Sequence, residues 1–301
     1  MDKKTLQSDG LLLITAVIWG SAFVAQRVGM DYVGPFTYNG IRFALGGLSL
    51  IPLMIYQQKT GFQMPRRSEA LSPTAMMVSG ILIGTVLFAG ASLQQVGLVY
   101  TTAGKAGFIT GLYVVIVPIL GVFIGQKSAL GTWGGALLAA VGLYFLSVTE
   151  SFTIQFGDLL EIIGAFFWSV HVLLLARFSN KVGPIRLAFI QFVICSVLSL
   201  ITGVIFEVIT LQGIIDAAVP ILYGGLGSVG IAYTLQVVAQ RYAHPAHAAI
   251  LLSLETVFAA LGGWLILDEI LSTRALVGCA LMFAGMIFSQ LHLILSKKAV
   301  V

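Results

Sequence analysis

Apolar residues run along this chain in long stretches, separated by short polar breaks. Each stretch has about 20 residues, the length that an α-helix needs to cross a hydrocarbon core. The breaks include Gly-Pro and His-Pro steps, which favour turns. We therefore predict ten transmembrane helices, over residues 10–28, 36–56, 75–97, 103–124, 130–149, 158–178, 185–208, 218–239, 246–267 and 275–295.

The composition supports a membrane protein. Of the 301 residues, 58% are hydrophobic and 9% are charged, whereas soluble domains carry about 25% charged residues. Such a chain has too little polar surface to cover a globule in water. In a bilayer only helices or a closed barrel satisfy the backbone, and the run lengths favour helices. We expect an all-α membrane protein.

The basic residues predict an orientation. If the N-terminus is cytoplasmic, 12 of the 16 Lys and Arg residues fall on the cytoplasmic side, as the positive-inside rule requires. The opposite loops carry acidic residues, among them Asp158, Glu207 and Glu269. We expect a bacterial-type plasma (inner) membrane protein with both termini in the cytoplasm. The net charge of +4 then reflects topology rather than a nucleic-acid partner.

An internal repeat divides the chain into residues 1–150 and 151–301. The segment "GPFTYNGIRF" (34–43) resembles "GPIRLAFIQF" (183–192), and "SLQQVGLVYTTAGKA" (92–106) resembles "TLQVVAQRYAHPAHA" (234–248). Each half holds five predicted helices. Because five is odd, the second half enters the membrane from the opposite side. Inverted repeats of this kind are typical of secondary transporters, with the substrate site near the midplane between the halves.

These features resemble the EamA-type domains of the drug/metabolite transporter superfamily. The resemblance rests on the duplicated five-helix pattern, a tryptophan in the first helix of each half, the "IRF" segment and the ending "LDEILSTRALVGCALMFAGMIF". It covers nearly the whole chain. It implies a central cavity lined by helices 1, 3, 4, 6, 8 and 9. The chain departs from the pattern at Gln126, where an acidic residue usually follows helix 4, whereas the second half keeps Glu269.

Polar residues inside the spans are the candidate site residues, because an ionisable group in a membrane is costly unless it has a function or a partner. The repeat pairs Gln94 with Gln236, Lys105 with His247, and Tyr113 with Glu255. Near the middle of its span, Glu255 is a candidate to carry a proton or bind a substrate amine. A structural hydrogen bond to a neighbouring helix is the alternative.

Two further sets of candidates complete the list. Lys105 either attracts a carboxylate or phosphate in the cavity or extends to the outer membrane interface. His171 lies one turn after Trp168 and either titrates near neutral pH or bonds to a carbonyl in the core. For Arg42 we expect a structural or anchoring role. The predicted substrate-binding residues are Trp19, Gln94, Lys105, Tyr113, Trp168, His171, Tyr233, Gln236, His247 and Glu255.

We therefore predict a secondary transporter of a small organic solute, an amino-acid-like metabolite or a drug, with export as the expected direction. The alternative is an uncoupled facilitator or an importer of a metabolite such as a nucleoside or vitamin. An intramembrane enzyme is a distant alternative, since no hydrolase, protease or nucleotide-binding motif occurs. No cofactor or metal is expected. The expected partners are the solute, with or without a proton, and the lipid bilayer, for a monomer or homodimer.

Overall fold

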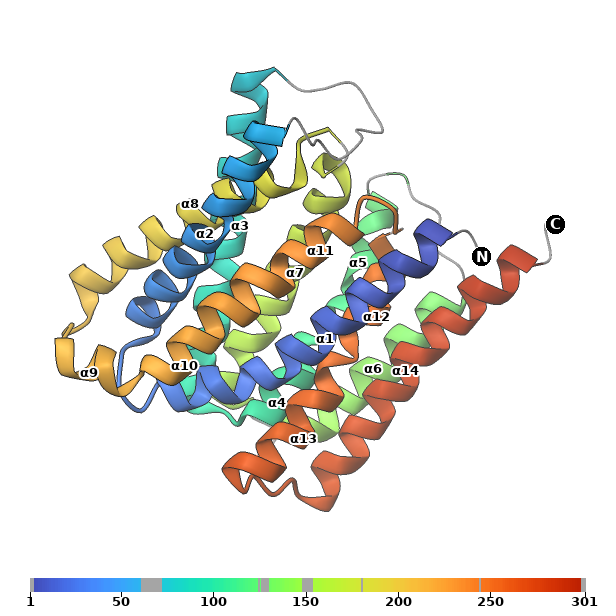
Figure 1. Ribbon diagram of the computed structural model, residues 1–301. Coiled ribbons are helices and arrows are strands. Elements are labelled where there is room, and N and C mark those ends of the chain that lie inside the picture. The colour runs from blue at the N-terminus through green and yellow to red at the C-terminus, as the bar shows by residue number, and fades with distance from the viewer. Residues whose placement is uncertain are drawn as a thin grey trace.

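The computed structural model describes residues 3–60, 72–123, 125, 130–147, 154–179, 181–243 and 245–298. Figure 1 shows these residues as a single bundle of helices, and they contain no β-strand. Among these residues, seven helical stretches are long and apolar enough to cross a membrane. Three shorter apolar stretches cover Trp133–Leu146, Leu251–Leu267 and Thr273–Gly285. The described part of the chain thus has the all-helical character that the sequence predicts.

The first half begins with three long helices, α1 (Lys3–Gly29), α2 (Pro35–Thr60) and α3 (Pro73–Tyr100). They extend the first three predicted spans by a few residues. The start of α3 follows from local chemistry: the Ser72 side chain accepts a hydrogen bond from the backbone of Ala75, and Pro73 occupies the first turn. The half continues with α4 (Ala103–Thr110), α5 (Tyr113–Phe123) and α6 (Leu130–Ser147).

The second half begins with α7 (Phe156–Phe178) and α8 (Pro184–Phe206), followed by the short α9 (Leu211–Asp216). Three consecutive segments, α10 (Ala218–Leu222), the π-helix η1 (Tyr223–Tyr233) and α11 (Thr234–Ala239), together cover the predicted span 218–239. The half ends with α12 (Pro245–Ser253), α13 (Glu255–Leu267) and α14 (Thr273–Lys298).

Two predicted spans are each broken into two helices. The first break separates α4 from α5 at residues 111–112, and the second separates α12 from α13 at residue 254. Residues 112 and 254 are 142 positions apart, which is the repeat offset of this region. At both breaks a backbone N–H bonds to the carbonyl three residues earlier, Leu112 to Ile109 at 3.0 Å and Leu254 to Leu251 at 3.4 Å. The helix tightens at the same place in each half.

The π-helix η1 packs closely against α2. A Cβ added at Gly225 would lie 2.7 Å from the Leu45 Cβ, and one added at Gly46 would lie 2.2 Å from Val229. Glycine therefore allows the two backbones to approach more closely than larger residues would permit. A π-helical stretch has wider turns than an α-helix and frequently marks a functional site. Its last residue, Tyr233, turns out to line the central cavity.

The helices pair across the two halves. α2 packs on α8, α3 on α7, α1 on α13 and on η1, and α6 on α14. Figure 1 shows α6 and α14 side by side at one edge of the bundle, with the first residues of α1 and the last of α14 at the same end. The pair α6–α14 meets through glycines: a Cβ at Gly142 would lie 2.6 Å from the Gly278 carbonyl oxygen.

The close contact of α6 and α14 predicts the effect of a single methyl group. In Gly142→Ala the new Cβ would meet backbone atoms of Gly278 and Met282 at 2.6 Å, so the helices must move apart. We expect a loss of about 1–3 kcal/mol of stability, measured as a lower melting temperature in detergent. Gly47→Ala is the control, because its nearest neighbour lies at 3.8 Å. Equal melting temperatures for the two variants would contradict the close packing.

Candidate functional site

A cavity lies at the centre of the bundle, between the two halves. Its volume is about 40 Å³. Helices of both halves contribute to its wall: α1 to α5 from the first, and α7, η1, α11, α12 and α13 from the second. The lining residues are Trp19, Phe23, Gln26, Arg42, Gln94, Thr110, Tyr113, Trp168, His171, Val172, Ser228, Tyr233, Gln236, Leu252 and Glu255.

Tyr233 is the centre of the aromatic wall. Its ring centroid lies 4.5 Å from that of Trp19, 6.2 Å from that of Trp168 and 6.3 Å from that of His171. The rings are tilted or edge-on, the arrangement that aromatic quadrupoles favour. Because Trp19 comes from α1 and Trp168 from α7, this wall joins the first helix of each half to η1. Trp19 Nε1 also donates to the Ser228 carbonyl oxygen of η1 at 3.3 Å.

A chain of side-chain hydrogen bonds crosses three helices beside the cavity. Trp168 Nε1 donates to Gln94 Oε1 at 3.0 Å, and Gln94 Nε2 donates to Gln26 Oε1 at 3.0 Å. This chain connects α7 to α3 and α3 to α1. His171 Nε2 lies 2.9 Å from Gln191 Oε1 on α8. Its described partner is therefore the carbonyl oxygen of an amide side chain in the core. Buried polar groups thus hold the wall in place.

The two helix breaks place Tyr113 and Glu255 at the cavity. Tyr113 is the first residue of α5 and Glu255 the first of α13. Both side chains are buried, and the Glu255 carboxyl group lies beside the Tyr113 hydroxyl. The residue pair that the repeat predicts at equivalent positions thus meets in three dimensions, across the interface of the halves.

Eight of the ten predicted binding residues line this cavity: Trp19, Gln94, Tyr113, Trp168, His171, Tyr233, Gln236 and Glu255. Lys105 does not. His247 belongs to α12, but its side chain lies outside the described ones. That these residues bind a solute stays a prediction. Within the described residues, no group of three or more His, Cys, Asp or Glu side chains is placed to hold a metal ion.

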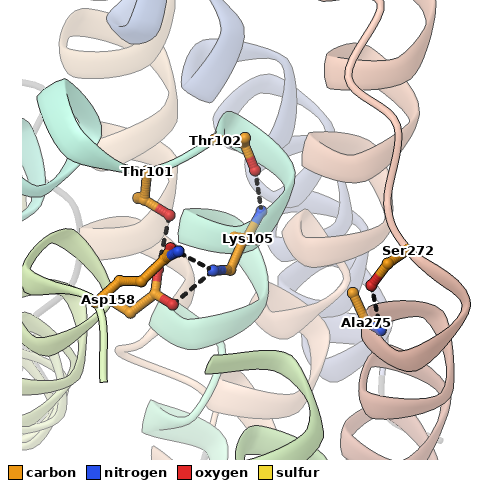
Figure 2. A network of polar contacts seen from close by, with 7 residues as sticks. Thr101, Thr102, Lys105, Asp158, Ser272 and Ala275 are labelled. Carbon is orange, nitrogen blue, oxygen red and sulfur yellow. Dashed lines mark hydrogen bonds and ion pairs between the residues drawn. The ribbon is translucent and has the colours of Figure 1, made fainter. Parts of the chain in front are cut away.

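Lys105 lies in a second, polar recess of about 470 Å³ at one end of the bundle. Its Nζ atom is 2.6 Å from Asp158 Oδ2 and donates to Gln155 Oε1 at 3.0 Å. The other Asp158 oxygen accepts from Thr101 Oγ1 at 2.7 Å. Figure 2 shows these contacts, with the Thr102 side chain capping the backbone N–H of Lys105. An ion pair therefore links α4 of the first half to α7 of the second.

Glu269 reinforces the same end. It follows α13, and its carboxylate accepts hydrogen bonds from the backbone N–H groups of Ala103 at 2.7 Å and Gly104 at 2.9 Å. A carboxylate at a helix N-terminus is stabilised by the free N–H groups and the helix dipole. The acid that the second half retains thus caps a helix of the first half. The departure at Gln126 lies outside the described residues.

Four polar residues of the cavity wall were not among the predicted binding residues: Gln26, Arg42, Thr110 and Ser228. Thr110 also donates to Glu161 Oε2 at 3.2 Å. Glu161 is fully buried on α7, and we did not single it out from the sequence. Of these four residues and Glu161, the sequence could have indicated two as site residues, because Arg42 and Glu161 are ionisable residues within predicted spans.

The ion pair between Lys105 and Asp158 predicts an unequal response to two similar substitutions. Lys105→Met leaves the fully buried Asp158 without its cation, and we expect a loss of about 3–5 kcal/mol of stability. Arg27→Met breaks an exposed pair with Asp31 at 2.9 Å and is expected to cost about 0–1 kcal/mol. Thermal unfolding in detergent measures both. The structural assignment fails if the two variants melt at the same temperature.

Comparison with known proteins identifies the family. The model of the EamA-like transporter family matches residues 7–148 and 155–291. An Archaeoglobus fulgidus protein described as an uncharacterized transporter is 32% identical over 296 residues, which is 96% of this chain and 87% of that protein. An uncharacterized transporter of Bacillus subtilis is 22% identical over 92% of this chain and 94% of its own. A crystal structure with 20% identity shares the fold, with a TM-score of 0.69 over 94% of this chain and 96% of that one. The chain belongs to the EamA-like transporter family and is a membrane transporter.

Proposed function

We propose that this chain is a secondary transporter that moves a small organic solute by alternating access around the central cavity. The observation that carries the proposal is the position of that cavity. It lies between the halves and is lined at two broken helices by Tyr113 and Glu255. Broken helices at the interface of two repeats are where secondary transporters bind their substrates.

The pairing of helices supports two inverted five-helix repeats, residues 1–150 and 151–301. We exchange each span of the first half with the span of the same rank in the second half. The contact of α3 with α7 then becomes that of η1 with α1. The contacts of α2 with α8 and of α6 with α14 map onto themselves. The two segments that the family model matches agree with the same division. Two such halves can exchange conformations and thereby expose one central site to each side in turn.

The size of the cavity supports a mechanism that requires movement. Pockets for small organic ligands have volumes of about 300 Å³ or more, whereas this cavity has about 40 Å³. A solute therefore fits only after the helices separate. At one end the separation must break the Lys105–Asp158 pair and the contacts of Glu269 with α4. We propose that this network closes the outer side of the transporter.

The orientation follows from the charge distribution of the loops. Lys105, Asp158 and Glu269 lie on the side that the basic residues assign to the exterior. The first residues of α1 and the last residues of α14 lie at the same end of the bundle in Figure 1. This position is consistent with two cytoplasmic termini in a plasma (inner) membrane.

Glu255 is the proposed coupling residue, which binds a proton or a substrate amine. The ionisable side chains that share its cavity are Arg42, Tyr113, His171 and Tyr233. The family resemblance favours export of an amino-acid-like metabolite or a drug. An uncoupled facilitator or an importer would use the same cavity without a carboxylate that couples transport to a proton gradient. The role of Glu255 therefore separates these alternatives.

The coupling role predicts that Glu255→Gln removes the dependence of transport on a pH gradient, because the amide neither gains nor loses a proton. A thermal-shift screen of amino acids, nucleosides and cationic drugs selects the solute, and its uptake into proteoliposomes is then measured at equal and at unequal pH. Asp216→Asn is the control, an exposed carboxylate whose hydrogen bond among the described residues is to Gln212 on its own short helix. An unchanged response to the gradient in Glu255→Gln would mean that Glu255 carries no coupling.

The proposed outer closure predicts a change in accessibility. Cys195 and Cys279 are first replaced by alanine, and a single cysteine is placed at Ser228 in the cavity wall. Adding Lys105→Met and Asp158→Asn together removes both charges of the pair. We expect a membrane-impermeant maleimide to label the cysteine severalfold faster from outside. Arg27→Met together with Asp31→Asn is the control, and we expect it to leave the labelling rate of the cysteine unchanged. Equal rates in both double variants would refute the closure.

A further inference from the structure

Arg42 is a buried cation in the wall of the central cavity. It lies on α2, one of the helices for which the family resemblance predicts no part in the cavity. Its side chain is 2% exposed. An arginine that anchors a helix at the membrane interface extends its charged tip toward water. Arg42 does the opposite, because its side chain is directed into the bundle and borders the cavity.

The contacts of Arg42 orient its guanidinium group. Arg42 Nε donates to Asn39 Oδ1 at 2.9 Å, and Asn39 Nδ2 donates to the Ala91 carbonyl oxygen of α3 at 3.0 Å. The guanidinium carbon also lies 5.5 Å from the centroid of the Tyr38 ring and 5.0 Å from that of Phe43. These neighbours hold the base of the group and leave its two terminal nitrogens with no hydrogen-bond partner among the described residues.

The charge of Arg42 has no counter-ion in the described part of the chain. Neither the Arg27–Asp31 pair nor the Lys105–Asp158 pair involves Arg42. The polar groups near the guanidinium include Tyr233 and Cys195, neither of which is a carboxylate. A guanidinium does not lose its proton in proteins, and a buried charge without a partner is strongly unfavourable. An anion that entered the cavity would remove this cost.

The chemistry of the group selects the kind of anion. The planar guanidinium presents parallel N–H donors that match the two oxygens of a carboxylate. Arg42 is the one Arg or Lys residue in the described cavity wall, so a singly charged group suits the site better than a phosphate dianion. Tyr233 is a neighbour of both Arg42 and Glu255. A solute that spans this tyrosine would reach a cation at one end and a carboxyl group at the other.

We propose that Arg42 is the anion-binding residue of the central cavity and that it binds the carboxylate of the transported solute. That the solute is transported rests on the proposed transport function, whereas the binding of its carboxylate rests on the geometry of Arg42. It assigns to Arg42 the attraction for a carboxylate that the sequence alone suggested for Lys105, which is paired with Asp158 outside the cavity. With an amine on Glu255, the solute class is a small zwitterion.

The test compares acids with their amides on purified protein in detergent. The probes are acetate, L-alanine, L-leucine and L-phenylalanine, each paired with acetamide or the matching amino-acid amide. Binding is followed by thermal shift and by the fluorescence of Trp19 and Trp168, which line the cavity. We expect at least one acid to bind the parent protein about tenfold or more tightly than its amide, as the loss of a charge-assisted hydrogen bond requires.

Three variants locate the effect. Arg42→Met should abolish the preference for the acid. Arg42→Lys, which keeps the charge but loses the planar fork, should keep a weaker preference and also guards against a folding defect. Arg177→Met, an exposed arginine on α7, should behave as the parent. The proposal is overturned if no acid is preferred over its amide by the parent, or if folded Arg42→Met or Arg42→Lys binds the acid as the parent does.

The inference and the transport function can fail separately. A protein that binds acids through Arg42 but moves none of them across proteoliposome membranes would retain the binding site and lose the proposed transport. A protein that transports only neutral or cationic solutes would retain the transport and lose the role of Arg42.

Discussion

Inside a bilayer, a polar side chain has no water to bond to, and the rest of this structure depends on that constraint. Many buried polar groups here are satisfied by another helix, as in the sequence of bonds from Trp168 through Gln94 to Gln26. Such bonds fix which helices lie together and how they are rotated. The groups left over are therefore informative. The side-chain oxygen of Gln236, a cavity-lining residue, has no hydrogen-bond partner in the described chain, and the hydrogen bond of Arg42 to Asn39 uses Nε rather than the terminal nitrogens.

The same constraint explains why the end of the bundle that contains Lys105 and Glu269 is held by charges. The first turn of α4, which begins at Ala103, exposes N–H groups that need acceptors. Glu269 supplies two such bonds to the start of α4. Lys105, in the first turn of that helix, brings a charge that Asp158 neutralises. Both acids come from the second half of the chain, so the contact that holds this end together also joins the two halves.

Much of the fold could be predicted because hydrophobic run length reports directly on a bilayer-spanning helix. The central residues were predictable for a related reason: a polar group in an apolar run is costly, and Glu255, Tyr113 and Gln236 stand out at once. The partners were harder to predict. Lys105 and Asp158 are 53 positions apart, and their contact depends on how α4 and α7 pack.

The orientation of single helices was the least predictable feature. Arg42 lies in the first two turns of its predicted span, where an arginine either faces the bundle interior or extends to the membrane interface, so the sequence alone did not decide its direction. The helix breaks were hidden for a similar reason. The π-helix η1 arises in a glycine-rich stretch whose conformation depends on its close contact with α2. Tertiary packing determines such details, and local sequence preferences do not.

The small volume of the central cavity has a consequence for the energy balance of the cell. A space of about 40 Å³ holds roughly two or three water molecules, and tightly packed aromatic rings surround it. Among the described residues, this cavity is too small to hold a column of water that crosses the bundle, and an ion that enters it meets a medium of low dielectric constant. We therefore expect the closed arrangement to oppose the leakage of ions through this cavity, which preserves ion gradients.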